Sequence, residues 1–262
     1  MSTVERAMQL LNYFENGRRE IGLSEFRMLA GRDKATTYRH LCALESVGMI
    51  EQNLETRRYR IGPAVLRLAR LREDSMPRLS GLRAALQTLS KATQETAHGS
   101  MLEGTLLRSM GYQEASEHST RVIINIDVLP LHATASGLAV LAFSGPDLRK
   151  AALEDVAQFT AYTPASEAAL DDALSLARAT GFAVSDQGFE LGVHGIAAPL
   201  FDESTKVAGA IAVAVPVGRM TAELGNRIRH ELSAAARDVT KSWGGTLPDA
   251  LLAAWSINSE KV

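Results

Sequence analysis

The sequence predicts an α+β protein built from an N-terminal winged helix–turn–helix, a connecting helix and a second α+β domain. Residues 23–52 have the pattern of two short helices joined by a tight turn, and a basic strand–turn–strand pattern follows directly. Beyond residue 78, helical repeats occur together with short apolar runs that are typical of an antiparallel sheet. The 262 residues, 46% of them hydrophobic, are enough for both domains.

Capping and turn residues predict the helix–turn–helix. Ser24 can cap the first helix, Gly31 suits a left-handed turn, and Asp33 can cap the second helix. The buried face of the second helix is expected at Leu41, Leu44 and Val47, and its opposite face carries Lys34, Thr37 and Tyr38. The first residues of such a second helix can reach base edges in the major groove of DNA. The alternative is a generic helical hairpin with a solvated polar face.

The next residues favour the winged-helix interpretation. Residues 49–52 and 57–61 are predicted to form two strands around the polar turn at 53–56. A helix–turn–helix followed by a basic hairpin is a winged helix, and guanidinium groups on the wing suit phosphates or a minor groove. The wing arginines are Arg57, Arg58 and Arg60. Residues 4–14 are expected to pack under these helices as an amphipathic helix, and residues 21–23 can add a short strand to the wing.

Charge is distributed unevenly between the two parts of the chain. Residues 1–72 carry 13 Lys and Arg against 8 Asp and Glu, whereas the remainder carries 15 against 22. A basic first part suggests a polyanion such as double-stranded DNA as its partner. The single cysteine, Cys42, excludes a disulfide framework, and we find neither a membrane-spanning apolar run nor a secretion signal. These observations favour a cytoplasmic protein that does not associate with membranes.

The predicted domains are a winged helix–turn–helix at 1–62, a connecting helix at 63–77, an α+β domain at 78–243 and a C-terminal tail at 244–262. Pro63 can open the connecting helix, and residues 74–77 are expected to break it. In the α+β domain we expect strands at 100–102, 106–110, 121–126, 182–184, 196–201 and 207–215, and helices at 82–96, 147–156, 166–180 and 221–243. Residues 132–143 suggest a loop that enters a helix. The run 207–215 is expected to be a central strand because it is continuously apolar. The tail is predicted to form a short helix that docks on a neighbour.

Ordered blocks of sequence resemble the IclR family of bacterial transcription regulators over about residues 4–241. The first part carries VERAMQLLNYFENG, KATTYRHLCALESVGMIEQ and RRYRIGPAVLRLA, and the second carries LPLHATASGLAVLAF and TGFAVSDQGFELGVHGIAAPLFDESTKVAGAIAVAVP. The resemblance implies that the second domain is a GAF-like effector-binding domain. It also implies a ligand-responsive regulator, with repression expected, of small-molecule catabolic genes. Such proteins form homodimers or tetramers on palindromic operators, because a two-fold protein reads a two-fold site.

By this resemblance, the DNA-facing residues are Lys34, Thr36, Thr37, Tyr38, Arg39, Arg57 and Arg58. Lys34 and Arg58 are expected on phosphates, and Thr37, Tyr38 and Arg39 near base edges. Tyr38 stands where histidine is common, and Arg57 stands where the wing turn usually has glycine, so we expect an unusual operator sequence. Two alternatives stay open: Thr36 can serve the helix start only, and Arg39 can pair with Glu45.

The resemblance assigns effector binding to Ala135, Ser136, Ser185, His194, Gly195, Ala212 and Ala214. Relatives usually have cysteine at Gly195, serine at Ala212 and Ala214, and an acidic residue at Ser185. The loss of these polar groups predicts a larger, more apolar pocket for an aromatic or otherwise bulky effector. His194 adjoins Gly195, but strand alternation turns it away if Gly195 faces the pocket.

Other functions find less support in the sequence. The spacing of His98, His118, His132 and His194 shows no metal signature, and His98 and His132 are interpreted as structural. An enzyme could use Ser136, His132 and Asp127 as a hydrolase triad, but no GxSxG motif is present. No cofactor motif is found. A structural adaptor that uses the winged helix for protein contacts is a further alternative.

Overall fold

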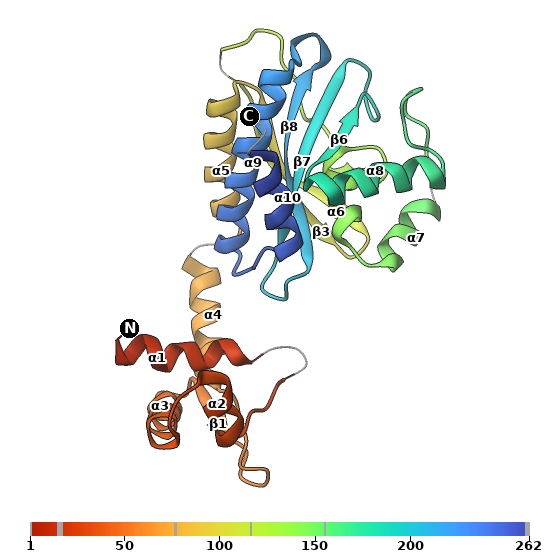
Figure 1. Cartoon of the computed structure of the whole chain (residues 1–262). Helices are drawn as coiled ribbons and strands as arrows, with labels where there is room; N and C mark the ends of the chain where they lie inside the picture. Colours follow the sequence, from red (N-terminus) through yellow and green to blue (C-terminus); the bar gives the residue numbers. More distant parts are fainter. Residues whose placement is uncertain (1, 15–17, 76–77, 116, 155, 260–262) are drawn as a thin grey trace. The chain divides into compact units, whose positions relative to one another are not determined.

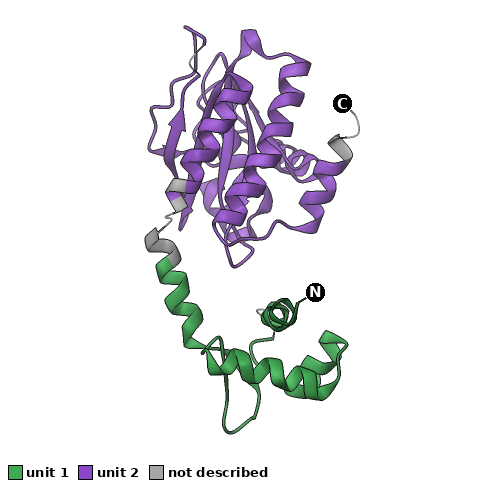
Figure 2. Cartoon of the chain, turned by 90° about the vertical axis from the view of Figure 1, so that its left-hand side faces the viewer, with its two compact units in different colours: residues 1–77 green, residues 78–262 purple. Residues whose placement is uncertain are grey.

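The computed structural model describes residues 2–14, 18–75, 78–115, 117–154 and 156–259. The chain divides into two compact units, residues 1–77 and 78–262 (Figure 2), and the predicted domain boundary at residue 78 coincides with this division. The break in the connecting helix was expected at residues 74–77; α4 continues through Ser75, and residues 76–77 lie outside the described residues. None of the described helices combines the length and apolar character that a membrane crossing requires.

The first unit is a winged helix–turn–helix followed by a helix (Figure 1). Its elements are α1 (Thr3–Met8) with a 3-10 extension (Gln9–Tyr13), α2 (Leu23–Ala30), α3 (Lys34–Ser46), β1 (Ile50–Gln52), β2 (Tyr59–Ile61) and α4 (Pro63–Ser75). Strands β1 and β2 pair antiparallel, as predicted for the wing. Ile21 adds a bridge to Tyr59, with reciprocal backbone hydrogen bonds of 2.9 Å. The helix–turn–helix and its wing are therefore confirmed.

The ends of α2 and α3 test the predicted caps. Gly31 ends α2 with a φ of 59°, and the Asp33 carboxylate accepts from the Thr36 N–H at 2.8 Å, both as predicted. The prediction that Ser24 caps α2 is wrong, because α2 begins at Leu23 and Gly22 occupies the N-cap position. The Glu25 carboxylate instead accepts from the Gly22 N–H at 2.9 Å and so satisfies the helix start.

A small apolar core holds the first unit together. It comprises Leu10, Ile21, Phe26, Leu41, Leu44, Ile50 and Tyr59. The prediction that Val47 belongs to the buried face of α3 is wrong, because its side chain is 63% exposed. Helix α3 ends at Ser46, and Val47 leaves the helical backbone, so the helical spacing no longer governs where its side chain points.

The second unit is an antiparallel sheet with helices on both faces (Figure 1). Its helices are α5 (Arg78–Thr93), α6 (Ala135–Phe143), α7 (Pro146–Glu154), α8 (Glu167–Thr180), α9 (Ala222–Ser242) and α10 (Asp249–Ser259), with a 3-10 turn at Val217–Arg219. Its strands are β3 (Thr96–Glu103), β4 (Leu106–Gln113), β5 (Val128–Leu129), β6 (Ala183–Asp186), β7 (Val193–Phe201) and β8 (Val207–Pro216). The strand order is β5-β4-β3-β8-β7-β6, so the prediction that residues 207–215 form a central strand is confirmed. The α+β class is confirmed as well.

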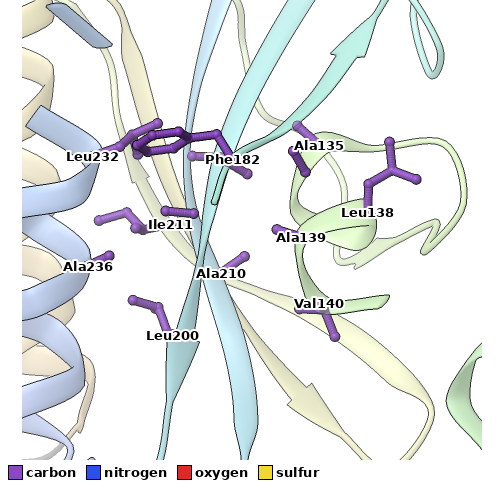
Figure 3. Close-up of a cluster of buried hydrophobic side chains, with 14 of the residues drawn as sticks. Ala135, Leu138, Ala139, Val140, Phe182, Leu200, Ala210, Ile211, Leu232 and Ala236 are labelled. Atoms are coloured by element: carbon purple, nitrogen blue, oxygen red, sulfur yellow. The ribbon is translucent and has the colours of Figure 1, made fainter. Parts of the chain in front are cut away.

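Small side chains let helices approach both faces of the central strands. In Figure 3, Leu232 and Ala236 of α9 lie on one side of the sheet, and Ala139 of α6 lies on the other. Ala210 and Ile211 of β8 lie between these two layers and are fully buried. The main core of the second unit is therefore continuous across its sheet.

Two segments of the second unit differ from prediction. The strand expected at residues 121–126 is wrong: this segment forms no ladder, and only Val128 and Leu129 pair with β4. The residues predicted as a separate tail belong to the second unit, because α10 packs against α8. Within α10, Leu251 and Trp255 are buried in the main core.

We predict that Trp255→Ala destabilises the second unit by about 3–5 kcal/mol. The Trp255 ring stacks on Phe182 with centroids 5.7 Å apart, and its Nε1–H donates to the Gly181 carbonyl at 3.0 Å. Chemical denaturation followed by circular dichroism measures the change. The control is Ser256→Ala at an exposed position of the same helix; equal losses in the two variants would contradict the docking of α10.

Candidate functional site

The start of α3 exposes a cluster of polar and cationic side chains in the first unit. Lys34, Tyr38 and Arg39 are exposed, and Tyr38 is 51% accessible. The Arg39 guanidinium donates to the Thr36 hydroxyl at 3.4 Å, and no salt bridge joins it to Glu45 among the described residues. The ion-pair alternative for Arg39 therefore has no support, and its charge is available at the surface.

Thr37 does not belong to this exposed cluster. Its side chain is fully buried, and its hydroxyl donates to the Asp33 carbonyl at 2.9 Å. It shares a helix face with Leu41 and Leu44, four and seven residues further on. The prediction that Thr37 lies near base edges is therefore wrong, and its role is to hold the start of α3 against the core.

The wing turn holds Arg57 in a left-handed conformation, with a φ of 59°. Its N–H donates to the Asn53 carbonyl at 2.8 Å, and the Gln52 side-chain amide donates to its carbonyl at 2.8 Å. Glycine adopts this conformation without steric cost, which explains why a family-typical glycine suits the position. The described residues provide neither an ion pair nor a side-chain hydrogen bond for the Arg57 guanidinium.

The other two wing arginines are engaged within the unit. Arg58 pairs with Glu25 at 2.6 Å and donates to the Glu20 carbonyl at 2.8 Å, which fastens the wing to the start of α2. Arg60 pairs across the hairpin with Glu51 at 2.6 Å. Arg58 was expected to contact phosphates; the structure gives its guanidinium a carboxylate partner within the unit.

Tyr38 and Arg57 are electrostatic neighbours, although 19 positions separate them in the sequence. A hydrogen bond with Cys42 is the largest cause that raises the pKa of Tyr38, and the positive charge of Arg57 acts in the opposite sense. We group the exposed cations at the start of α3 and in the wing turn with Tyr38 under the name basic edge, defined as Lys34, Tyr38, Arg39 and Arg57.

The second unit contains a cavity of about 460 Å³ on the α6 side of its sheet. The residues that line it are His98, Val122, Ile123, Ile124, Asn125, Ile126, Leu129, Thr134, Ala135, Ser185, Phe189, Glu190, Val193, Gly195 and Ala214. Three neighbouring strands supply one wall, since Ser185, Gly195 and Ala214 are register partners in a single row. The segment 122–126, which forms no ladder, supplies another wall.

Four of the seven predicted effector residues line this cavity: Ala135, Ser185, Gly195 and Ala214. Ala212 shares their sheet face but is fully buried. His194 points away, as strand alternation indicated, and its Nδ1 lies 3.2 Å from the Asp186 carboxylate. Ser136 lies behind the wall and contacts His98. Sequence reasoning missed His98, Phe189 and the segment 122–126 as lining residues.

His98 and Ser136 form a buried pair beside the cavity. Nε2 of His98 lies 3.1 Å from the Ser136 hydroxyl, and Nδ1 is buried without a hydrogen-bond partner among the described residues. Burial lowers the pKa of His98 to about 4, so the imidazole is neutral near pH 7. His132 is used elsewhere, since its Nε2 lies 2.8 Å from the Ala157 carbonyl. The hydrolase triad considered above is therefore not assembled.

Arg219 anchors the segment that leads into the cavity wall. Its guanidinium pairs with both oxygens of the buried Glu95 carboxylate at 2.7 and 2.6 Å and donates to the Thr120 carbonyl at 2.8 Å. The Thr96 hydroxyl donates to the Val122 carbonyl at 2.7 Å. Side chains of the sheet and its connections thus hold a wall that lacks strand pairing. Over the described part of the chain, no three His, Cys, Asp or Glu side chains gather as metal ligands.

A winged helix with an exposed basic edge, joined to a domain with an apolar cavity, defines a ligand-responsive DNA-binding regulator. Comparison with known proteins gives the family. Residues 3–54 match the IclR helix-turn-helix domain, and residues 74–241 match the bacterial transcriptional regulator IclR C-terminal domain. The chain belongs to the IclR family of transcription regulators, which are DNA-binding proteins and not enzymes.

Relatives match along nearly the whole chain. The HTH-type transcriptional regulator XynR of Escherichia coli is 31% identical over 251 residues, which cover 93% of this chain and 98% of XynR. The glycerol operon regulatory protein of Streptomyces griseus is 28% identical, with 91% and 96% covered. The crystal structure of a putative IclR regulator from Silicibacter sp. TM1040 is 44% identical, with a TM-score of 0.83 and 95% and 99% covered.

We predict that His98 makes the second unit less stable as pH falls from about 6.5 to about 4. The folded state holds the imidazole neutral in this range, whereas the unfolded chain binds a proton, so stability present above pH 6.5 is lost on acidification. The loss from this residue is on the order of 3 kcal/mol. Denaturation followed by tryptophan fluorescence reports on this unit, because both tryptophans, Trp243 and Trp255, lie in it. His98→Gln should flatten the pH dependence; an unchanged slope would contradict the assignment.

Proposed function

We propose that the protein is a cytoplasmic repressor of catabolic genes that binds a palindromic operator as a homodimer, or as a pair of dimers. An aromatic or otherwise bulky effector controls its affinity for DNA. The basic edge is the single observation that best supports DNA binding: three of its four members are cations without a carboxylate partner among the described residues. Phosphates supply the charge that such a surface needs.

Residues of the basic edge have different proposed roles. Lys34 and Arg57 contact phosphates, because a charge is all that such a contact requires. Tyr38 and Arg39 reach base edges, since their exposed side chains lie just over one turn into the helix that enters the major groove. Thr36 serves the helix start through the Asp33 cap. Thr37 and Arg58, which the resemblance also assigned to DNA, act through the core and the wing anchor.

Helix α4 supports the proposal of self-association. Leu66, Leu68 and Leu71 expose 61%, 45% and 54% of their surface in the isolated chain. Several leucines on one exposed helix are a surface that pairing with a second copy would cover. A two-fold dimer presents two copies of α3 and therefore matches a palindrome. Whether dimers pair further depends on surfaces of the second unit.

The cavity supports an effector that is bulky and mostly apolar. Its volume of about 460 Å³ falls in the range of small-molecule sites, and aliphatic or aromatic side chains form most of its wall. Glycine and alanine stand at Gly195 and Ala214, where family members usually carry polar side chains, and this leaves room in the wall. An effector alters DNA binding only if it prefers one of two states of the protein.

We predict that Arg57→Gln weakens binding to all duplexes and lowers the slope of log affinity against log salt concentration by about one. The variant removes the charge and keeps a polar side chain. Arg60→Gln is the matched control, because its charge is already paired with Glu51. Fluorescence anisotropy with the gene's own upstream DNA and a scrambled duplex measures both variants. Equal effects of the two substitutions would refute the assignment of Arg57.

Tyr38→Ala is expected to change sequence preference as well as affinity. A lost base contact costs about 1–3 kcal/mol on the cognate site and little on random DNA. The wild-type protein should prefer its own upstream DNA over the scrambled duplex, and the variant should lose part of that preference. If the wild-type protein shows no preference in the presence or absence of candidate effectors, the proposed function itself fails.

We predict that 2-naphthoate and benzoate bind more tightly than glyoxylate and pyruvate. Larger apolar ligands gain more from burial in this cavity. Isothermal titration calorimetry with the full chain measures the order of affinities. Gly195→Val should reduce binding of the aromatic acids selectively, because a Cβ at this position lies 3.1 Å from the Ala135 Cβ and narrows the cavity. Tighter binding of the short acids would overturn the proposed effector class.

A further inference from the structure

We infer that the effector is uncharged and presents a hydrogen-bond acceptor, such as a carbonyl oxygen, to the His98–Ser136 pair. This inference rests on the proposed effector cavity and makes its ligand chemistry specific. It depends on two observations: the charges of the cavity lining, and the count of protons that the polar groups of its buried wall can donate. The Asn125 amide, on the exposed part of the lining, lies outside that count.

The lining offers no full positive charge. Among the described residues that border the cavity there is neither lysine nor arginine, and the one ionised group is the Glu190 carboxylate on its exposed side. A carboxylate taken out of water needs a cation or several strong donors in compensation. In this cavity it would meet a carboxylate of the same sign instead. Charge therefore favours a neutral ligand.

The remaining polar side chains of the buried wall already use their protons. The Ser185 hydroxyl donates to the Ala133 carbonyl at 2.7 Å. The Thr134 hydroxyl donates to the Pro130 carbonyl at 2.9 Å and accepts from the Gly137 N–H at 3.0 Å. These groups stabilise the start of α6 and do not offer a donor to a ligand.

The His98–Ser136 pair has one donor more than it uses. A neutral imidazole carries one N–H and the hydroxyl carries one O–H, but the pair makes a single hydrogen bond, at 3.1 Å. If the hydroxyl donates to Nε2, the proton on Nδ1 has no acceptor among the described residues. If Nε2–H donates, the hydroxyl proton is left over. His98 borders the cavity, but Nδ1 is buried and Ser136 is not a lining residue, so an acceptor on a bound molecule reaches the spare donor when the imidazole turns toward the cavity.

The N-terminus of α6 is the feature of the cavity that most favours an anionic ligand, but its partial charge alone does not compensate a carboxylate. Thr134 and Ala135 border the cavity at this helix end, where backbone N–H groups carry a partial positive charge. That partial charge is about half an elementary charge, whereas a carboxylate carries a full one. A neutral carbonyl gains from the same N–H groups without the cost of removing an ion from water.

Matched pairs of aromatic acids and amides test the inference. Benzoate and benzamide, phenylacetate and phenylacetamide, and 2-naphthoate and 2-naphthamide have nearly the same shape and differ in charge at pH 7.5. Isothermal titration calorimetry with the full chain should show each amide binding at least tenfold more tightly than its acid. If the acids bind more tightly, or no amide binds, the inference is overturned.

Three variants test which side chains determine the affinity for the amides. Ser136→Ala should lower amide affinity about 2- to 10-fold, the range expected for one neutral hydrogen bond. Ser185→Ala is the matched control, because its proton is already donated to Ala133, and it should change amide affinity less. Glu190→Gln should strengthen binding of the acids more than binding of the amides. Thermal melts establish that each variant is folded. Equal losses in the two serine variants would contradict the role of the pair.

Failure of this inference is distinguishable from failure of the proposed function. If 2-naphthoate binds more tightly than 2-naphthamide, but also more tightly than pyruvate, the bulky effector stands and only its neutrality is lost. The test for preference of upstream DNA does not depend on either result.

Discussion

The two-sided burial of the central sheet is the constraint on which the second unit depends. Strand β8 lies between β3 and β7 and is covered on both faces, so its side chains must be small where helices come close. At Gly209, a Cβ would lie 2.1 Å from the Ser100 carbonyl oxygen, which leaves glycine as the residue that fits. That constraint comes from the neighbouring strand β3; on the other face of the sheet, contact with α6 favours small residues such as Ala212 and Ala214. The cavity exists because small residues continue to the edge where α6 begins.

The sequence was most informative where one physical rule acts locally. Continuous apolar character predicted the central strand, and Gly31 and Asp33 predicted the ends of the helices that they cap. Prediction failed where a distant partner decides the outcome. Residues 121–126 have the β-branched composition of a strand. However, β4 pairs with β3 along one edge, and along its other edge it pairs only with Val128 and Leu129. The β-propensity of a segment depends on its own residues, whereas a β-ladder also requires a neighbouring strand. The sequence alone does not identify that strand.

The candidate sites show the same division. The prediction that His194 points away from the cavity is confirmed. Side chains alternate along a strand, so His194 and its neighbour Gly195 lie on opposite faces. No such local rule predicts which of the wing arginines are free of ion pairs. Arg58 and Arg60 find carboxylates at Glu25 and Glu51, and the first of these lies 33 positions away in the sequence. Counting charges along the sequence therefore overestimates how many of them are free to meet DNA.

The segment 122–126, which lines the cavity without strand pairing, is the part of the wall whose conformation can change at the least energetic cost. An effector that changes DNA affinity must bind two states of the protein unequally, and the states must differ near the ligand. A change in the conformation of β7 and β8 would cost much free energy, because their ladder and the two layers of helices that cover it would have to change together. The segment 122–126 is held by fewer bonds, among them those from Thr96 to Val122 and from Arg219 to the adjoining Thr120. It contributes five lining residues, so a bulky apolar ligand contacts the part of the cavity that is least constrained by backbone pairing. Under the proposed function, the size and apolar character of the effector set how much of this segment it contacts.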